Sequence, residues 1–255
     1  MDVGRISNRH FIFPGLVLVC ALALALLGCG TESSDPVARR VLTRAMTAMA
    51  GLKSLRESGS NELSSEREST PGVKLTFDSE MELASPLKPT SHTVIKRGTA
   101  RLDVYSLDGY LYNEVSPGQW TKSLAVGTSS MSPRDLAQIA KGATNVRVAS
   151  QSAKRYEIGF DVEAGSFKNI ELLTGSSGGS SVPADTAEAL EELQMSAVYT
   201  ISKASHYVEK VETTMIVRSS TTADEASGTM TVTFLDFNKP VKIELPVAAK
   251  AATEK

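Results

Sequence analysis

Residues 73–83 read VKLTFDSEMEL, in which apolar side chains occupy most odd positions and polar side chains occupy the even ones. The same alternation recurs at residues 156–163, 211–218 and 229–234. Because successive side chains on a strand point to opposite faces, such segments bury one face and expose the other, which is typical of antiparallel sheets. Less regular segments predict further strands near residues 55–65, 91–97, 100–106, 110–115, 144–151, 196–203 and 241–245.

Three segments have the features of helices. Residues 36–52 repeat apolar side chains every three or four positions, behind Ser34 or Asp35 as a cap. Residues 132–143 begin with a serine cap and a proline in the first turn. Residues 181–195 carry a group of acidic side chains. A sheet with one apolar face must close on itself or be covered by helices. We therefore expect an α+β fold, a strongly curved antiparallel sheet wrapped around a few helices, with an apolar hollow between them.

Composition excludes several classes of function. The 255 residues carry 27 basic and 29 acidic side chains, a formal net charge of -2, which argues against a nucleic-acid partner. Two cysteines and three histidines leave too few ligands for the usual structural zinc sites. No G-x-S-x-G motif appears near a strand–helix turn, and His92 and His206 lie in polar strands as expected for surface imidazoles. We expect no catalytic residue, no metal and no cofactor.

The first 29 residues have the pattern of a secretory signal. Arg5 and Arg9 precede an uncharged apolar run at residues 11–27, followed by Gly28 and Cys29. The sequence LLGC at residues 26–29 resembles the bacterial lipobox, in which the cysteine is acylated, for example with palmitate, and becomes the new N-terminus. An ordinary signal peptide or an uncleaved anchor is the alternative. We expect the protein to be anchored through Cys29 to the outer face of the cell membrane.

This interpretation sets the domain organisation. Residues 1–28 are the predicted lipoprotein signal peptide, and residues 29–35 are a flexible tether. Residues 36–247 form one domain, because strand patterns continue on both sides of the glycine- and serine-rich loop at 174–181. Residues 248–255 are predicted to be a disordered tail.

Three motifs follow the lipobox in a fixed order. The first helix ends in AMTAMAGLKSL, similar to the A-x-x-A-M-x-x-L-K-S start of many lipoproteins. Residues 108–112, DGYLY, and 118–122, GQWTK, resemble a D-G-x-x-Y…G-x-W-x-K hairpin. Residues 234–243, FLDFNKPVKI, are similar to an F-x-D-Y-N-x-P-V-x-I ending, with Phe237 where tyrosine is usual. In this order the motifs resemble LppX/LprG-type bacterial lipoproteins and their uncharacterised relatives, over nearly the whole mature chain.

The resemblance implies a LolA-like half barrel with an apolar cavity that binds or carries a lipid or glycolipid in the cell envelope. Its lining would come from the inward-facing apolar strand positions, which ordinary core packing requires equally. Three methionines among them favour an adaptable lining. These candidate ligand-binding residues are Val73, Leu75, Phe77, Met81, Leu83, Ile158, Phe160, Met215, Val217, Met230, Val232 and Phe234.

Two other functions remain open from the sequence. A non-catalytic envelope scaffold or sensor of the same fold, without cargo, predicts a filled interior and an exposed apolar patch. An extracytoplasmic hydrolase predicts that His92 or His206 converges with a serine and a carboxylate. An envelope protein partner is compatible with either function.

Overall fold

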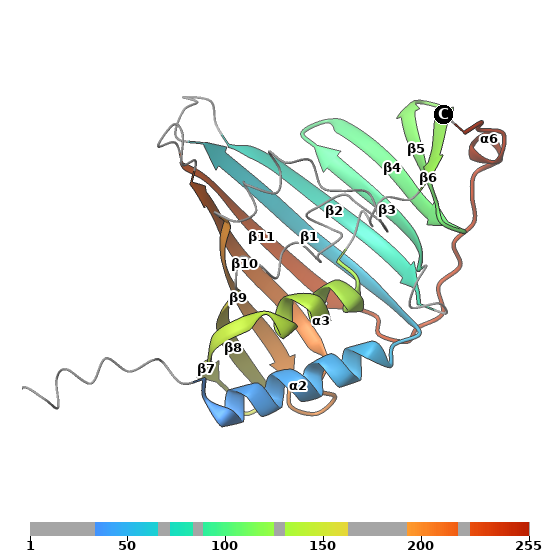
Figure 1. Ribbon diagram of the computed structural model, residues 1–255. Coiled ribbons are helices and arrows are strands. Elements are labelled where there is room, and N and C mark those ends of the chain that lie inside the picture. Colours follow the sequence, from blue (N-terminus) through green and yellow to red (C-terminus); the bar gives the residue numbers. More distant parts are fainter. Residues whose placement is uncertain are drawn as a thin grey trace, which may run out of the picture. The chain divides into compact units, whose positions relative to one another are not determined.

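The computed structural model describes residues 34–65, 72–83, 89–124, 131–162, 193–218 and 225–254 (Figure 1). The helices described are α2 (Pro36–Ala50), α3 (Pro133–Lys141) and α6 (Val247–Lys250). The strands described are β1 (Ser54–Ser65), β2 (Val73–Glu82), β3 (Thr90–Arg97), β4 (Ala100–Leu107), β5 (Tyr110–Ser116), β6 (Gln119–Leu124), β7 (Ala143–Gln151), β8 (Arg155–Val162), β9 (Leu193–Ser202), β10 (Val208–Arg218) and β11 (Glu225–Leu235).

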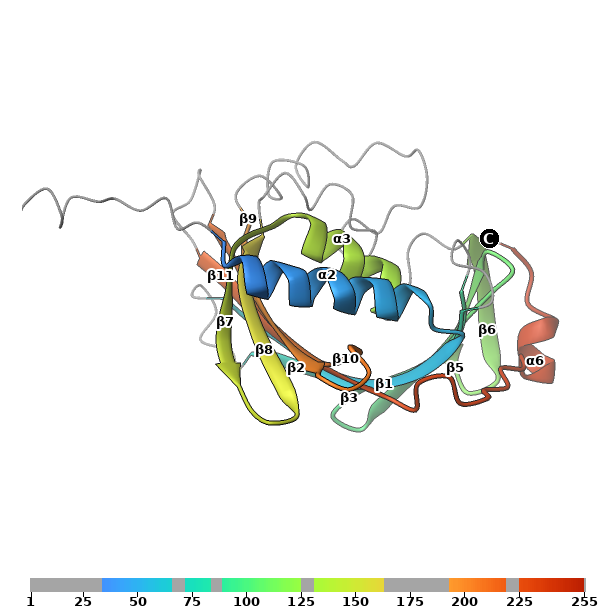
Figure 2. The same cartoon turned by 90° about the horizontal axis from the view of Figure 1, so that it is seen from below.

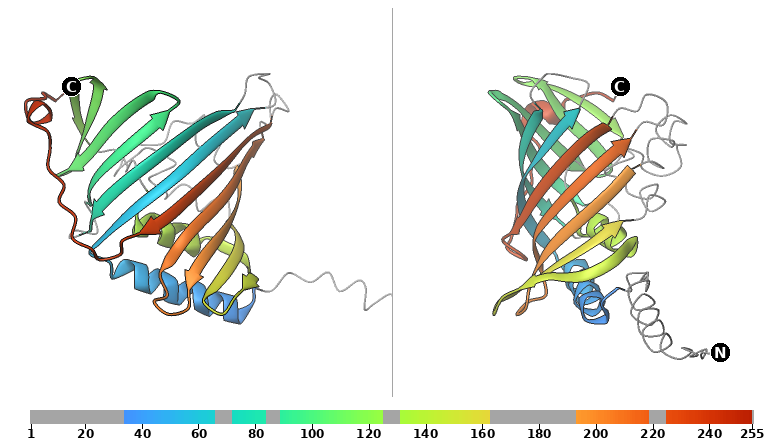
Figure 3. Two further views of the ribbon diagram at one scale, coloured as in Figure 1. Left: turned by 180° about the vertical axis from the view of Figure 1, so that it is seen from behind. Right: turned by 90° about the vertical axis from the view of Figure 1, so that its left-hand side faces the viewer.

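These strands form one open antiparallel sheet. Its 11 strands lie in the order β6-β5-β4-β3-β2-β1-β11-β10-β9-β8-β7, so β6 and β7 are the two edges. β1 pairs with β2 on one side and with β11 on the other. Figure 3 shows this central pair, in which the first strand of the sheet lies beside the last. The sheet therefore consists of two meanders, β1–β6 and β7–β11, joined at β1 and β11.

Helices α2 and α3 lie side by side on the concave face of the sheet (Figure 2). Asp35 caps α2 by accepting a hydrogen bond from Val37 N at 2.8 Å, and Ser132 caps α3 in a reciprocal capping box with Asp135. The buried side of α2 consists of Ala38, Leu42, Ala45 and Met49, one stripe of an amphipathic helix.

We call the sheet face that contacts these helices the inner face. Its core side chains come from both ends of the chain. Ile158, Phe160 and Tyr199 are buried in the same apolar cluster as Leu136 and Met49. The Phe160 and Tyr199 rings meet edge to face at 4.9 Å. This cluster is the described core of the protein.

The turn after β11 fixes the entry to β1. Asn238 N donates to Ser54 O at 2.9 Å, and Asn238 Oδ1 accepts from Lys53 N at 2.8 Å. Ser54 Oγ donates to Lys239 O at 2.6 Å. Asp236 and Asn238 both have positive φ, which asparagine and aspartate tolerate better than most residues. The turn residues of the FLDFNKP motif thus act structurally, by holding the two central strands together.

Chain segments near the two termini contact the two edges of the sheet. Asp35 N donates to Val146 O of β7 at 2.7 Å, and Val146 N donates to Ser34 Oγ at 3.2 Å. At the other edge, Glu254 forms a parallel bridge with Lys122 of β6.

The ten other predicted strands are confirmed within a few residues, but residues 241–245 do not form one. Their alternating burial shows an extended segment with one side covered, and Pro240 and Pro246 at its ends have no N–H for a ladder. This segment leads to α6 beside β6 (Figure 1). Helix α6 stands where the sequence predicts a disordered tail from residue 248.

Two further predictions differ from the structure. The helix predicted at 181–195 is wrong at its end, because Leu193–Met195 belong to β9, and its remainder lies outside the described residues. Strand β6 was predicted only as part of the hairpin resemblance, because QWTKSL has no regular apolar alternation. β6 is a strand because its backbone is hydrogen-bonded to β5, although its side chains do not alternate regularly.

Gly59, in the middle of β1, allows a close approach of an aromatic ring. A Cβ atom at this position would lie 2.4 Å from Phe77 Cζ and 2.5 Å from Thr231 O. The Phe77 ring therefore lies directly over the Gly59 backbone, from the paired position on β2. Glycine in a strand often marks such a site.

We predict that Gly59→Ala destabilises the protein by about 1–3 kcal/mol, because the added methyl group must displace the Phe77 ring or the β11 backbone. Urea unfolding measures the change. Gly51→Ala is the control, since its Cβ would meet nothing closer than 3.5 Å, and should change stability by less than about 0.5 kcal/mol. Equal stability of Gly59→Ala and wild type would contradict the packing described.

Candidate functional site

The candidate site is the inner face, which has two zones. Five of the predicted lining residues are fully buried, and all five belong to the core cluster: Met81, Ile158, Phe160, Val232 and Phe234. Six are only half-buried: Val73, Leu75, Phe77, Leu83, Met215 and Met230. The side chain of Val217 lies outside the described residues. The predicted residues therefore divide into a packed core and a partly accessible group.

The sheet register brings most of the half-buried residues together. Phe77 lies opposite Gly59, which lies opposite Val232 of β11. Leu75, Asn61 and Met230 occupy the next inner row, and Met215 lies one row further along on β10. Leu75, Phe77, Met215 and Met230 thus form an apolar surface across β2, β1, β11 and β10. We call it the apolar surface below.

Leu83 and Ile158 do not join this surface. Leu83 follows the end of β2 near the start of β1, where its N–H donates to Lys53 O at 2.8 Å. Ile158 lies on β8 in the core cluster. The twelve predicted residues are therefore a set of inner-face positions, of which a smaller group is half-exposed.

Polar residues of the inner face were not predicted. Among the described residues, four buried side-chain oxygens have no hydrogen-bond partner: Glu57 Oε2, Asn61 Oδ1, Ser91 Oγ and Thr213 Oγ1. Register places all four on the inner face, with Glu57 opposite Ser79 and Phe234. The available signal was that β1 has polar residues at both odd and even positions, which is unusual for a central strand.

Glu57 is the most perturbed of these groups. It is 2% exposed, and its Oε1 accepts a hydrogen bond from Met131 N at 3.2 Å. Burial raises the pKa of Glu57 well above its ordinary value, the Met131 N–H partly opposes this shift, and the nearby Asp135 raises the pKa further. Burial thus favours the protonated form of this carboxyl, and its second oxygen, Oε2, has no hydrogen-bond partner among the described residues.

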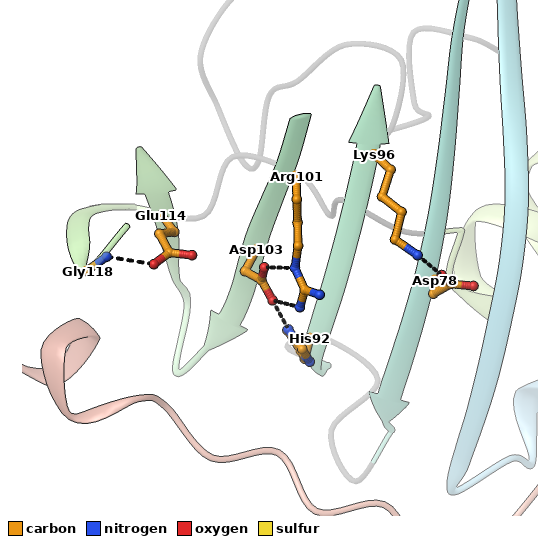
Figure 4. A network of polar contacts seen from close by, with 7 residues as sticks. All are labelled: Asp78, His92, Lys96, Arg101, Asp103, Glu114 and Gly118. Carbon is orange, nitrogen blue, oxygen red and sulfur yellow. Dashed lines mark hydrogen bonds and ion pairs between the residues drawn. The ribbon is translucent and has the colours of Figure 1, made fainter. Parts of the chain in front are cut away.

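The outer face carries a polar network on β2–β5 (Figure 4). Asp103 Oδ1 lies 2.9 Å from His92 Nε2, and Arg101 donates two hydrogen bonds to the same carboxylate. The Arg101 hydrogen bond lowers the pKa of Asp103, against its partial desolvation. His92 also stacks on Tyr105 at 4.2 Å. His92 is thus a partly exposed imidazole on the outer face, and Asp103 and Tyr105 hold its ring.

This network does not have the geometry of a hydrolytic site. Within the described residues, no serine hydroxyl is hydrogen-bonded to His92 or His206, and no group of three or more His, Cys, Asp or Glu side chains is placed to hold a metal ion. His206 lies in the β9–β10 turn with φ of 60°. Asp103 and His92, a carboxylate and a histidine as in a triad, do meet, but no described serine is hydrogen-bonded to this pair.

Comparisons with known proteins define the family. Residues 37–254 match the DUF6612 model, described as a family of unknown function. The chain belongs to this family. No curated protein matches the chain. Of the helices in the described ranges, none is long and apolar enough to span a membrane.

Among solved structures, the fold of a mycobacterial lipoprotein agrees with the resemblance to LppX/LprG-type proteins. LprF from Mycobacterium bovis aligns with a TM-score of 0.50 and 14% identity, over 84% of this chain and 99% of that one. A DUF1329 family protein from Desulfovibrio piger gives 0.35 and 8%, over 83% and 95% of the chains. A LolA superfamily protein from Nitrosomonas europaea gives 0.33 and 8%, over 82% and 94%. At this identity the likeness to LprF establishes the fold alone.

Glu57 predicts a specific dependence of stability on pH. Its pKa is above the ordinary 4.5 in the folded protein, so above pH 4.5 the unfolded chain releases a proton that the folded protein keeps. The Glu57 contribution to stability therefore falls as the pH rises above 4.5.

We predict that Glu57→Gln, which keeps the acceptor for Met131 N without an ionisable proton, is more stable than wild type at pH 7.5 and loses this advantage near pH 4. Thermal unfolding between pH 4 and 8 measures the difference. Glu62→Gln, an exposed carboxylate on the same strand, should leave the pH profile unchanged. A stability difference for Glu57→Gln that is constant with pH would show that Glu57 ionises normally.

Proposed function

We propose that the protein is a lipoprotein of the cell envelope that binds or carries a lipid or glycolipid. In this proposal residues 1–28 are removed, acylated Cys29 holds the protein on the outer face of the membrane, and residues 36–247 form the binding domain. The sheet wraps around α2 and α3 as a half barrel, and the ligand lies in an apolar cavity between them. The proposal needs no catalytic step.

The apolar surface carries the proposal. Leu75, Phe77, Met215 and Met230 are half-buried on the same face on which α2 and α3 bury the rest of the core. Covering such a surface with an acyl chain provides roughly 25 cal/mol per Å² of apolar area removed from water. Methionine side chains adapt to chains of different shape, since their thioethers are flexible.

A scaffold or sensor without cargo is the alternative function, and it requires an exposed apolar patch for its partner. The large apolar side chains exposed among the described residues are Val37, Val115, Leu124, Leu235 and Val247. They come from five different elements or their ends, and single exposed apolar residues are normal on protein surfaces. The apolar surface of the inner face therefore favours a ligand over a docked protein.

We predict that the full chain carrying Cys29→Ser, purified from cells, contains co-purifying lipid, and that adding Phe77→Asp removes most of it. A buried carboxylate in contact with an acyl chain is costly to desolvate. Native mass spectrometry measures bound lipid, and circular dichroism checks the fold. Thr76→Asp places the same charge on the outer face, where residue 76 is exposed, and should keep the lipid. Lipid-free wild type that also fails to bind in lipid-extract titrations would contradict the carrier function.

The anchor has a separate test. We predict that the wild-type chain, expressed in a bacterial host that modifies lipoproteins, fractionates with membranes and gains the mass of its acyl chains at Cys29. Cys29→Ser should lose that mass. Intact-protein mass spectrometry reads the modification directly. An unmodified Cys29 in mature protein would instead indicate an ordinary signal peptide or an uncleaved anchor.

A further inference from the structure

The inner face contains buried polar atoms that have no hydrogen-bond partner in the described part of the chain. Thr213 is 3% exposed and Glu57 is 2% exposed, yet in the described part of the chain Thr213 Oγ1 and Glu57 Oε2 have no hydrogen-bond partner. The buried Asn61 Oδ1 is in the same state. An unmet buried hydrogen-bonding group costs about 1–3 kcal/mol. Three such groups on one face therefore suit a ligand that supplies hydrogen-bond partners.

These groups border the apolar surface. Asn61 and Thr213 lie on either side of Met230 in one cross-strand row, so their Cα atoms are about 10 Å apart, two strand spacings. Leu75 continues this row beyond Asn61, and Ala197 continues it beyond Thr213. Glu57 is four residues from Asn61 on β1, about 13 Å along the strand. A ligand lying along the apolar surface would meet Asn61 and Thr213 first and Glu57 deeper, near α3.

The fourth unsatisfied atom lies elsewhere. Ser91 Oγ is on β3, in a row with Met81 and Ser106. It is therefore separated from Thr213 by β2, β1 and β11, and we do not include it.

The charges around these groups limit the ligand. On β1, β2 and β8–β11, the described inner-face positions hold no lysine, arginine or histidine, and Glu57 is the one carboxyl among them. The second buried carboxyl nearby is Asp135 of α3. Arg39, Arg40 and Arg44 of α2 and Arg134 of α3 are exposed. By register, the exposed Arg97 at the end of β3 also lies on the inner face, one strand beyond Leu75. An ionised phosphate or carboxylate among Asn61, Thr213 and Glu57 would thus lie near two acids, on strands whose described inner-face positions hold no base.

We propose that Asn61, Thr213 and Glu57 form a hydrogen-bonding subsite for the uncharged polar groups of an acyl lipid, its hydroxyl and ester carbonyl groups, and that this subsite discriminates against ionised head groups. The Thr213 hydroxyl donates to an ester carbonyl, Asn61 Oδ1 accepts from a ligand hydroxyl, and Glu57 Oε2 forms a hydrogen bond with a further uncharged polar group of the ligand. The subsite rests on the proposed lipid-binding function and adds the class of lipid to it.

A matched pair of lipids tests the charge. Fluorescent diacylglycerol and phosphatidic acid with identical acyl chains differ only by the phosphate. The full chain carrying Cys29→Ser is titrated with each lipid, and we expect diacylglycerol to bind at least about tenfold more tightly, because the phosphate must be desolvated on β1, β11 and β10, whose described inner-face positions hold no cation. Phosphatidic acid binding as tightly as diacylglycerol overturns the subsite.

Substitutions test the individual groups. Thr213→Val removes the hydroxyl at constant shape, and Asn61→Leu removes the amide. Each should weaken diacylglycerol binding about three- to tenfold, as expected for a lost buried hydrogen bond. Thr214→Val, exposed on the opposite face of the same strand, should bind like wild type. Unchanged diacylglycerol affinity in both Thr213→Val and Asn61→Leu overturns the subsite.

Thermal stability separates a ligand-binding role from a structural one. If the Thr213 hydroxyl forms a hydrogen bond only with a ligand, Thr213→Val removes a buried group without a partner. This substitution should raise the Tm of the ligand-free protein and lower its affinity for diacylglycerol. A lower Tm would mean that the hydroxyl has a structural partner, and this result overturns the assignment. Failure of wild type to bind either lipid would refute the proposed function together with the subsite, whereas binding without discrimination refutes the subsite alone.

Discussion

The pairing of β1 with β11 is the interaction on which the structure depends. Each meander, β1–β6 and β7–β11, is built from neighbours in sequence, and only this pair joins them into one sheet. The contacts of Asn238 with Ser54 and Lys53 hold the same junction from one end. Because β1 and β11 lie some 170 residues apart in the chain, this pairing carries a high loop-closure cost and should form late in folding.

The junction also places the candidate site. The apolar surface spans β2, β1, β11 and β10, so its residues come from both meanders and assemble only when the sheet is complete. Phe77 lies over Gly59 from β2, and Met230 and Met215 come from β11 and β10 on the other side of β1. Next to it, α2 and α3 bury the core with ordinary close packing. Phe77, Met215 and Met230 pack against this core while part of each side chain stays accessible.

Much of this fold was predictable from periodicity. Strands such as β2 and β8 have one buried and one exposed face, so apolar and polar side chains alternate along their sequences. Residues 241–245 show the limit of that signal, since an extended segment covered on one side gives the same pattern without pairing. The polar members of the inner face were not predictable. Glu57, Asn61 and Thr213 become informative only through the register, which shows that β1 is central and which positions of β10 face inward. Apolar residues of the core and of the candidate site also have the same alternating pattern in the sequence. Only the packing of α2 and α3 against the sheet shows which of them are fully buried.

An open sheet has two edge strands with unpaired backbone N–H and C=O groups. An extended peptide or a second molecule can pair with these groups as a further strand. Here the backbone of Asp35 occupies part of the β7 edge and that of Glu254 occupies part of the β6 edge. These two contacts therefore oppose the pairing of a second molecule with the sheet edges. In a closed barrel the edges would be absent, but the described sheet is open. Shortening either end would expose main-chain donors and acceptors at a lateral border, so expression boundaries for this domain bear directly on its solubility.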